Sequence, residues 1–264
     1  MSFQIYQGDC FELLERVHSI DHAIFDPPYS EHVHSKSRAG NRKKPLLNGN
    51  GHLSKSTFSR EVDFGFDPID VTWMEQMSDL LFDRVKRWVL VFCDVESSHL
   101  WIGALVSAGF DYCRTGFWEK IGATPQFTGD RPGVACEAIV CCHKPGRKRW
   151  NGGGKAGIWK HWTCIEHGGK STANDSREHP TQKPLPLMLD LVRDFTDPGE
   201  TILDPTMGAG TTGVACVRLG RSFVGIEKIE KHFETAKTRL EAETIGSDAV
   251  SFRAGQLPMF GGGQ

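Results

Sequence analysis

The sequence predicts an α/β fold with a mostly parallel sheet and helices on both of its faces. Two strand–helix–strand patterns carry this prediction, one at residues 2–26 and the other at residues 201–227. Each pattern ends in an acid at the tip of a strand. Right-handed crossovers place such tips at one edge of a parallel sheet, where ligands bind in folds of this kind. The 264 residues suffice for one large α/β domain or two small ones.

The first pattern begins with an alternating strand at residues 2–7 and continues through a short amphipathic helix to the apolar run at 23–25. Asp26-Pro27-Pro28-Tyr29 follows directly. Consecutive prolines interrupt both a sheet ladder and a helix, so the backbone must turn rigidly here. The acid suits an N–H donor and the ring suits stacking on a planar group. A proline turn with an incidental tyrosine is the alternative.

The middle of the chain alternates helices and strands. The capping-box pattern Thr72-x-x-Glu75 predicts the start of a helix, and the apolar run at 88–92 predicts a strand buried on both faces. After a further helix, residues 111–119 and 137–143 predict two strands. Pro and Gly residues between these two strands indicate a long hairpin loop.

Two irregular segments, 30–66 and 144–178, carry local positive charge although the formal net charge is −2. The second segment interleaves Trp150, Trp159 and Trp162 with its basic residues, a pattern typical of surfaces that hold nucleic acid. Solvated loops are the alternative for the basic residues, and a loop whose Trp side chains pack back onto the domain is the alternative for the second segment. The candidate DNA-binding residues are Lys36, Arg38, Arg42, Lys43, Lys44, Arg147, Lys148 and Arg149.

The second pattern combines a strand at 201–204, Gly208-x-Gly210, a helix, and a strand at 222–226 that ends in Glu227. Such glycines let a ligand approach the backbone, and an acid at the second strand tip binds ribose hydroxyls. The pattern lacks the third glycine of the dinucleotide fingerprint and the Lys-Ser/Thr of a phosphate loop. A nucleoside cofactor without a pyrophosphate therefore fits better than NAD or ATP.

These motifs resemble those of the amino-methylating DNA methyltransferases that use S-adenosylmethionine. Asp26-Pro27-Pro28-Tyr29 resembles their catalytic motif, and residues 204–212 resemble their cofactor motif. The segment 179–184 looks like the one that precedes the cofactor loop in their β group. The order, with the catalytic motif first and the cofactor motif last, is the circular order of that group. The resemblance covers nearly the whole chain and thins at 30–66 and 144–178.

The resemblance implies a Rossmann-like class I methyltransferase fold, circularly permuted. Its mostly parallel seven-stranded sheet would take one antiparallel strand from the hairpin at 111–143. Asp26 and the Pro27 carbonyl would accept hydrogen bonds from the target amino group, and Tyr29 would stack on the flipped base. Other residues would surround the cofactor, with Lys183 near its carboxylate. The cofactor set is Asp9, Cys10, His179, Thr181, Lys183, Asp204, Thr206, Met207, Gly208, Gly210, Thr211, Thr212, Glu227 and Lys228.

The implied reaction is methylation of the exocyclic N6 of adenine in double-stranded DNA, as in restriction-modification systems. The acid at the first motif position favours adenine, because cytosine-N4 enzymes more often carry Ser there. Cytosine N4 is the alternative, followed by an inactive nucleic-acid-binding homologue. Methylation of protein side-chain amides and an unrelated Rossmann enzyme are weaker alternatives, since neither explains the Asp26 turn together with the basic segments.

The expected organisation is a single methyltransferase domain over 1–264. It includes the basic loop 30–66, a small irregular target-recognition region at about 122–178, and a flexible tail at 255–264. Within the tail, Gln256–Phe260 resembles peptides that dock on the bacterial sliding clamp; a frayed tail is the alternative. Members of the family often form homodimers.

Signal-like and membrane-spanning apolar runs are missing from the sequence, which predicts a cytoplasmic protein of bacterial or phage origin. The eight cysteines lack a CxxC pair, as expected for reduced thiols. His161-x-x-Cys164-x-x-His167 lacks an obvious fourth ligand, so no metal is predicted.

Overall fold

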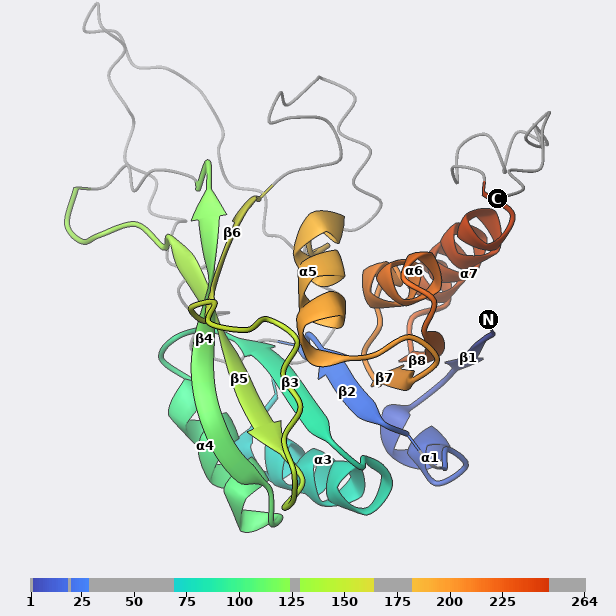
Figure 1. Cartoon of the computed structure of the whole chain (residues 1–264), viewed down its shortest axis with the longest axis horizontal. Coiled ribbons are helices and arrows are strands. Elements are labelled where there is room, and N and C mark those ends of the chain that lie inside the picture. The colour runs from blue at the N-terminus through green and yellow to red at the C-terminus, as the bar shows by residue number, and fades with distance from the viewer. Residues whose placement is uncertain (1, 19, 29–68, 124–128, 164–181, 247–264) are drawn as a thin grey trace, which may run out of the picture.

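The computed structural model describes residues 2–18, 20–28, 69–123, 129–163 and 182–246. These residues build an eight-stranded sheet in the order β1-β8-β7-β2-β3-β5-β4-β6 (Figure 1). The strands are β1 (Phe3–Gln7), β2 (His22–Phe25), β3 (Trp88–Cys93), β4 (Asp111–Ile121), β5 (Cys136–His143), β6 (Ile158–Trp162), β7 (Thr201–Asp204) and β8 (Ser222–Glu227).

The sheet is mostly parallel. Strands β1, β8, β7, β2 and β3 pair in parallel, β5 is antiparallel to both β3 and β4, and β6 is parallel to β4. This confirms the predicted fold class and the predicted antiparallel strand, which is β5. The β4–β5 hairpin also matches the prediction for the middle of the chain.

The expected count of seven strands is wrong, because β6 adds an eighth at the sheet edge. It lies in a segment that the sequence predicted to be irregular. Trp159 is 2% exposed and its indole N–H donates to Asp194 at 2.9 Å, so this ring packs into the protein. Ile158 and Trp162, at the two ends of the strand, are each 46% exposed. One buried residue between exposed ones marks an edge strand, a pattern that the surrounding glycines and charges hid.

Helices cover both faces of the sheet, as predicted. Helices α1, α3 and α4 pack with one apolar cluster, and α5, α6 and α7 pack with the other on the opposite face (Figure 1). Burial of an apolar stripe on each side holds these three layers together. The helices are α1 (Cys10–Leu14), α3 (Val71–Arg84), α4 (Ser98–Ser107), α5 (Leu185–Phe195), α6 (Thr211–Arg218) and α7 (Glu230–Thr244). In the described residues, each helix is too short or too polar to cross a bilayer.

The start of α3 differs from the sequence-based expectation. The helix is capped by Asp70, whose carboxylate accepts from the Trp73 amide at 2.8 Å, and not by the Thr72 capping box. Asp is at least as good an N-cap as Thr, and it occurs two residues earlier. The helix therefore begins two residues earlier, which is about half a turn.

The topology decides which side chains share an edge. The parallel strands β2, β7 and β8 all end at one edge of the sheet, which carries Asp26, Asp204 and Glu227. Because β5 runs in the opposite direction, its first residues reach this same edge, and Ala138 pairs with Cys93 at the end of β3. Glu137 therefore arrives near Asp26 from a strand whose pattern gave no functional signal.

Candidate active site

A cavity of about 480 Å³ opens at the carboxyl edge of the sheet. This volume lies in the range of small-molecule sites. The wall is built from the segments that follow β1, β2, β7 and β8, and it contains most of the predicted site residues that the structure describes. These are Asp9, Cys10, Asp26, Pro27, Lys183, Asp204, Thr206, Met207, Gly208, Thr211, Thr212, Glu227 and Lys228.

Asp204 holds both ends of the glycine turn, residues 205–210, by hydrogen bonds. One carboxylate oxygen accepts from the Thr206 amide at 3.1 Å, and the other accepts from the Thr212 hydroxyl at 2.6 Å. The side chain is 3% exposed. Burial raises its pKa to about 7, against the hydrogen bonds from Thr212 and Thr206. Asp204 thus ties β7, the turn and the start of α6 into one unit.

Gly210 is the residue that lets the turn enter α6. Its φ is 76°, in the left-handed region, where a side chain is strained. A Cβ there would also lie 2.9 Å from the Cβ of Ala236 on α7. Gly210 does not line the cavity. Gly210 lets α6 and α7 pack closely together, whereas Gly208 forms part of the cavity wall.

Glu227 closes the glycine turn from β8. Its Oε2 accepts from the Gly208 amide at 2.9 Å, and its Oε1 accepts from the Ile229 amide at 2.8 Å. A carboxylate oxygen can accept two hydrogen bonds, so each oxygen of Glu227 has capacity for a hydroxyl group in the cavity beside its backbone donor. Burial raises the pKa of Glu227, against hydrogen bonds from Ile229 and Gly208.

Asp26 is linked both to the glycine turn and to a buried lysine. The Thr206 hydroxyl donates to its backbone carbonyl at 3.1 Å, so the two motifs lie in contact although 180 residues separate them. Lys183 Nζ donates to Asp26 Oδ2 at 2.5 Å. The other oxygen, Oδ1, is buried and receives no hydrogen bond from any described residue. A buried acceptor without a donor is rare in proteins and marks a functional position.

A chain of alternating charges continues behind Asp26. Lys183 also lies 3.1 Å from Glu137, and Glu137 lies 2.6 Å from Lys120 on β4. Burial raises the pKa of Asp26 to about 6; the Lys183 charge opposes this shift, and the Glu137 charge adds to it. The pKa of Glu137 is lowered, because Lys183 and Lys120 together outweigh the opposing effect of burial.

Some predicted residues lie elsewhere. Tyr29, Lys36, Arg38, Arg42, Lys43, Lys44, His179 and Thr181 fall outside the described residues, as does the tail 255–264. Arg147, Lys148 and Arg149 follow β5 and therefore lie at the amino edge of the sheet, opposite the cavity. Lys148 pairs with Asp111 there at 2.7 Å.

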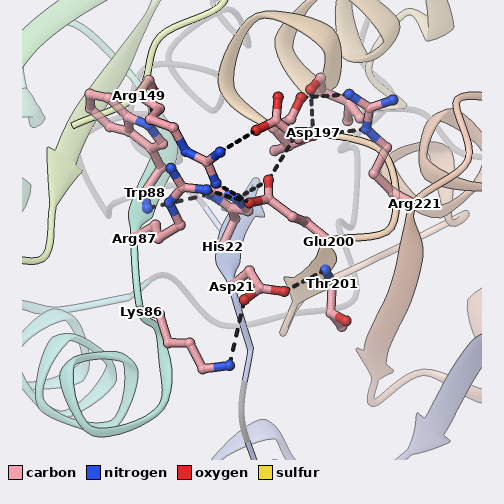
Figure 2. Close-up of polar contacts among 12 residues, drawn as sticks. Asp21, His22, Lys86, Arg87, Trp88, Arg149, Asp197, Glu200, Thr201 and Arg221 are labelled. Atoms are coloured by element: carbon pink, nitrogen blue, oxygen red, sulfur yellow. Dashed lines mark hydrogen bonds and ion pairs between the residues drawn. The ribbon is translucent and has the colours of Figure 1, made fainter. Parts of the chain in front are cut away.

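The amino edge holds a second polar cluster, in which Arg149 takes part. Figure 2 shows Arg87, Arg149 and His22 converging on the carboxylate of Glu200. His22 is fully buried and lies 2.8 Å from Glu200. Burial lowers the pKa of His22, which favours a neutral ring that donates its Nε2–H to Glu200. This cluster fastens the starts of β2, β3 and β7.

Sequence reasoning missed several residues of the cavity. Phe11, Ile69, Trp73, Gln182 and His232 line it as well. Trp73 meets Phe11 edge-on with ring centroids 5.4 Å apart. Trp73 lies in a helix that the sequence predicted, but nothing in the sequence separated the side of α3 that faces the cavity from the side that faces the core.

A family model described as DNA methylase matches residues 20–238 of the chain. Among curated proteins, the chain is 27% identical over 258 residues to the Type II methyltransferase M.HinfI of Haemophilus influenzae, covering 89% of this chain and 67% of that protein. It is also 27% identical over 262 residues to the Type II methyltransferase M2.MboI of Moraxella bovis, covering 90% of this chain and 87% of that protein.

Solved structures agree with these matches. The M1.HpyAVI–SAM complex superposes with a TM-score of 0.62 at 25% identity, covering 90% of this chain and all of that one. The cytosine-N4-specific PvuII DNA methyltransferase superposes with a TM-score of 0.67, covering 90% of this chain and 86% of that one. At 18% identity, the second likeness shows the fold alone.

Proposed function

The chain belongs to the DNA methylase family of N6/N4 type, and from this premise we propose that it methylates the exocyclic N6 of adenine in DNA. The observation that carries the proposal is the meeting of two motifs in one cavity. Asp26 offers a buried carboxylate oxygen without a donor from the described residues, and its backbone carbonyl accepts from the Thr206 hydroxyl of the glycine turn at 3.1 Å. An amino group held by the acid would lie next to a ligand held by the turn.

The cavity fits S-adenosylmethionine, which supplies a sulfonium methyl group when bound. The family match and the SAM complex of M1.HpyAVI support this cofactor. Glu227 would accept from ribose hydroxyls with the capacity that its backbone bonds leave. Asp9 and Cys10 line the same cavity on the side of β1. Gly208 lines the cavity, and a Cβ placed on it would point into open space. Because glycine has no Cβ, a ligand can come close to the backbone there.

Asp26 and the Pro27 carbonyl would activate the amino group. An exocyclic base amine is a weak nucleophile because its lone pair is delocalised into the ring. Hydrogen bonds from its N–H groups to these two acceptors localise the lone pair and stabilise the positive charge that develops on nitrogen. A carboxylate with a pKa raised to about 6 by burial is also a suitable acceptor for the proton that nitrogen loses.

The remaining acceleration would come from placing the nitrogen in line with the methyl group, which is worth roughly 7–11 kcal/mol in well-oriented reactions. A base within a duplex cannot reach a cavity at a sheet edge, so it must be flipped out, at a cost of a few kcal/mol. We propose that Tyr29 stacks on this base and offsets part of the cost.

Adenine is proposed over cytosine because Asp26 is an acid, whereas cytosine-N4 enzymes more often carry Ser at this position. We propose that the chain belongs to the β group, which the order of its motifs supports. The relatives are named Type II methyltransferases, which supports a role in a restriction-modification system. Cytosine N4 is the second candidate, because its amino group offers the same two N–H donors.

We propose that the single domain 1–264 holds double-stranded DNA through the basic loop 30–66 and the target-recognition region at about 122–178. The basic loop includes Lys36, Arg38, Arg42, Lys43 and Lys44. The amino-edge position of Arg147, Lys148 and Arg149 sets them apart from the cavity, so any contact they make with DNA would be distant from the flipped base. A homodimer and clamp binding through Gln256–Phe260 are further proposals.

The proposal is tested by incubating the protein with S-adenosylmethionine and DNA and analysing the nucleosides by mass spectrometry. We expect N6-methyladenine from the wild type. Asp26→Ala should lose at least about 10²–10³-fold in turnover, the usual effect of removing one preorganised polar group. The affinity of Asp26→Ala for the cofactor, measured by calorimetry, should stay within a few-fold of that of the wild type. N4-methylcytosine would select the second candidate, and near-normal turnover of Asp26→Ala would contradict the assignment of Asp26.

A further inference from the structure

Lys183 lies in the cavity but contacts protein carboxylates. The resemblance to other methyltransferases placed this cation near the carboxylate of the cofactor. In the structure its Nζ lies 2.5 Å from Asp26 Oδ2 and 3.1 Å from Glu137, and 5.1 Å from the ring centroid of Phe92. Its side chain is 7% exposed. A lysine is almost never buried to this extent unless it is paired, so these contacts define its place.

Three different parts of the fold fix this arrangement. Asp26 follows β2, Glu137 is the second residue of the antiparallel strand β5, and Lys183 precedes Pro184 at the start of α5. Proline fixes its own φ and restricts the residue before it to extended conformations. The lysine stem therefore leaves the start of α5 in a narrow range of directions, and Glu137 holds its end.

The two oxygens of Asp26 are in different situations. Oδ2 is bound by Lys183, whereas Oδ1 is buried and receives no hydrogen bond from the described part of the chain. The Asp26 side chain as a whole is 24% exposed, so an incoming group has access to it. A lysine fixed on one oxygen restrains the rotation of the carboxylate, so the oxygen without a donor keeps a defined orientation.

We propose that Lys183, held by Glu137, is a positioning residue that fixes one oxygen of Asp26 and leaves the other to accept the amino N–H of the target base. This inference rests on the proposed function for the identity of the incoming group. It assigns Lys183 to the base-activating side of the cavity instead of the cofactor side. It also gives Glu137 a role, although Glu137 does not line the cavity.

Lys183 and Glu137 should act on Asp26 in opposite directions. The cation favours the carboxylate form of Asp26, and the second acid disfavours it. Removal of Lys183 should therefore raise the pH at which Asp26 takes up a proton, and removal of the Glu137 charge should lower it. Other groups that face Asp26 stay the same in both variants: Lys120 on β4, Cys93 at the end of β3 and Asp204 on β7.

The experiment compares Lys183→Met, Lys183→Arg and Glu137→Gln with the wild type in two ways. Turnover on DNA is measured as a function of pH, and the Asp26 carboxyl is titrated by carbon NMR, with Asp26→Asn to assign its signal. The matched control is Lys155→Met, which removes a lysine paired with Asp194 at 2.7 Å, distant from the cavity. Circular dichroism confirms that each variant is folded.

For Lys183→Met we expect the acidic limb of turnover and the Asp26 titration to move upward by about 1–3 pH units. Turnover at pH 7 should fall by about 10²-fold, the cost of a mispositioned group, while cofactor affinity stays within a few-fold. Glu137→Gln should move both curves downward. Lys183→Arg should restore the wild-type limb in part, and Lys155→Met should leave both curves in place.

Two results would overturn the inference. One is a fall in turnover of Lys183→Met with both titration curves unchanged, which would mean a structural role. The other is a loss of cofactor affinity of more than tenfold with Asp26 unaffected, which would return Lys183 to the cofactor. If the wild type methylates no DNA, the proposed function fails, while the NMR titration still decides whether Lys183 controls Asp26.

Discussion

Ionic clusters lie at both edges of the sheet, but the carboxylates at their centres, Glu200 and Asp26, differ in how completely they are hydrogen-bonded. At the amino edge, Glu200 accepts from His22 at 2.8 Å, from the Asp197 amide at 2.6 Å and from two arginines (Figure 2). At the carboxyl edge, Asp26 leaves one buried oxygen without a donor from the described residues. A saturated cluster fastens strands together, whereas an unsaturated one is ready to bind a ligand.

The pKa values of the acids differ in the same way. Hydrogen bonds from Asp197 and His22 outweigh burial and lower the pKa of Glu200. Burial prevails at the other edge and raises the pKa of Asp204 to about 7 and that of Asp26 to about 6. The amino edge therefore stabilises charge in the folded state. At the carboxyl edge, burial brings the pKa values of Asp26 and Asp204 closer to physiological pH, as is common at functional sites, whereas the pKa of Glu137 is lowered by its two lysines.

The largest expected difference comes from breaking the saturated cluster. Glu200→Ala leaves partly buried cations without their acid and should lower the free energy of unfolding by about 3–5 kcal/mol, measured by urea denaturation. Turnover on DNA below the unfolding transition should stay within a few-fold. The control Glu243→Ala breaks the Arg218 pair on the surface of α7 and should cost less than about 1 kcal/mol. A large loss of turnover in folded Glu200→Ala would contradict a purely structural amino edge.

The second expected difference between the two edges is in how the free energy of unfolding depends on pH. Because Asp204 has a raised pKa, the folded state holds a proton that the unfolded state has released, and its contribution to stability is lost as the pH rises through about 7. Asp204→Asn removes this loss. We therefore compare the free energy of unfolding of Asp204→Asn with that of the wild type at pH 5 and at pH 8. The difference should shift in favour of the variant by about 2–3 kcal/mol as the pH rises from 5 to 8.

Glu200→Gln provides the opposite case for the same measurement. The lowered pKa of Glu200 gives stability at neutral pH that is lost as the pH falls through the folded value. The defect of Glu200→Gln relative to the wild type should therefore shrink on acidification. Parallel pH dependences of the two variants would show that the edges do not differ in the way described.

The smallest expected effect lies at the contact between the two motifs. Thr206→Val keeps the side-chain volume but removes the hydroxyl that donates to the Asp26 carbonyl. One such hydrogen bond is worth about 1 kcal/mol, so turnover should fall by up to about tenfold while stability changes little. Thr206→Ser retains the hydroxyl and should be close to the wild type. Equal turnover of all three proteins would remove this contact from the positioning of Asp26.

Local patterns along the chain were enough to predict the fold class and the strand tips that carry the acids. Apolar runs, proline turns and the Gly208-x-Gly210 spacing are local signals, and parallel strands bring their ends to one edge whatever the details of packing. Asp26, Asp204 and Glu227 could therefore be placed at a common edge before the structure was considered. The family motifs added the expectation of a cofactor and a target amine.

The charges that meet Asp26 depend on how distant segments pack together, which local patterns do not show. Glu137 reaches it because β5 is antiparallel, and Lys183 reaches it because α5 begins above the same edge; neither contact follows from spacing along the chain. In the same way, the basic run 147–149 was separated from the cavity by the direction of β5. Local patterns record what one segment prefers, whereas ion pairs between distant segments depend on strand order and direction, which the whole core fixes.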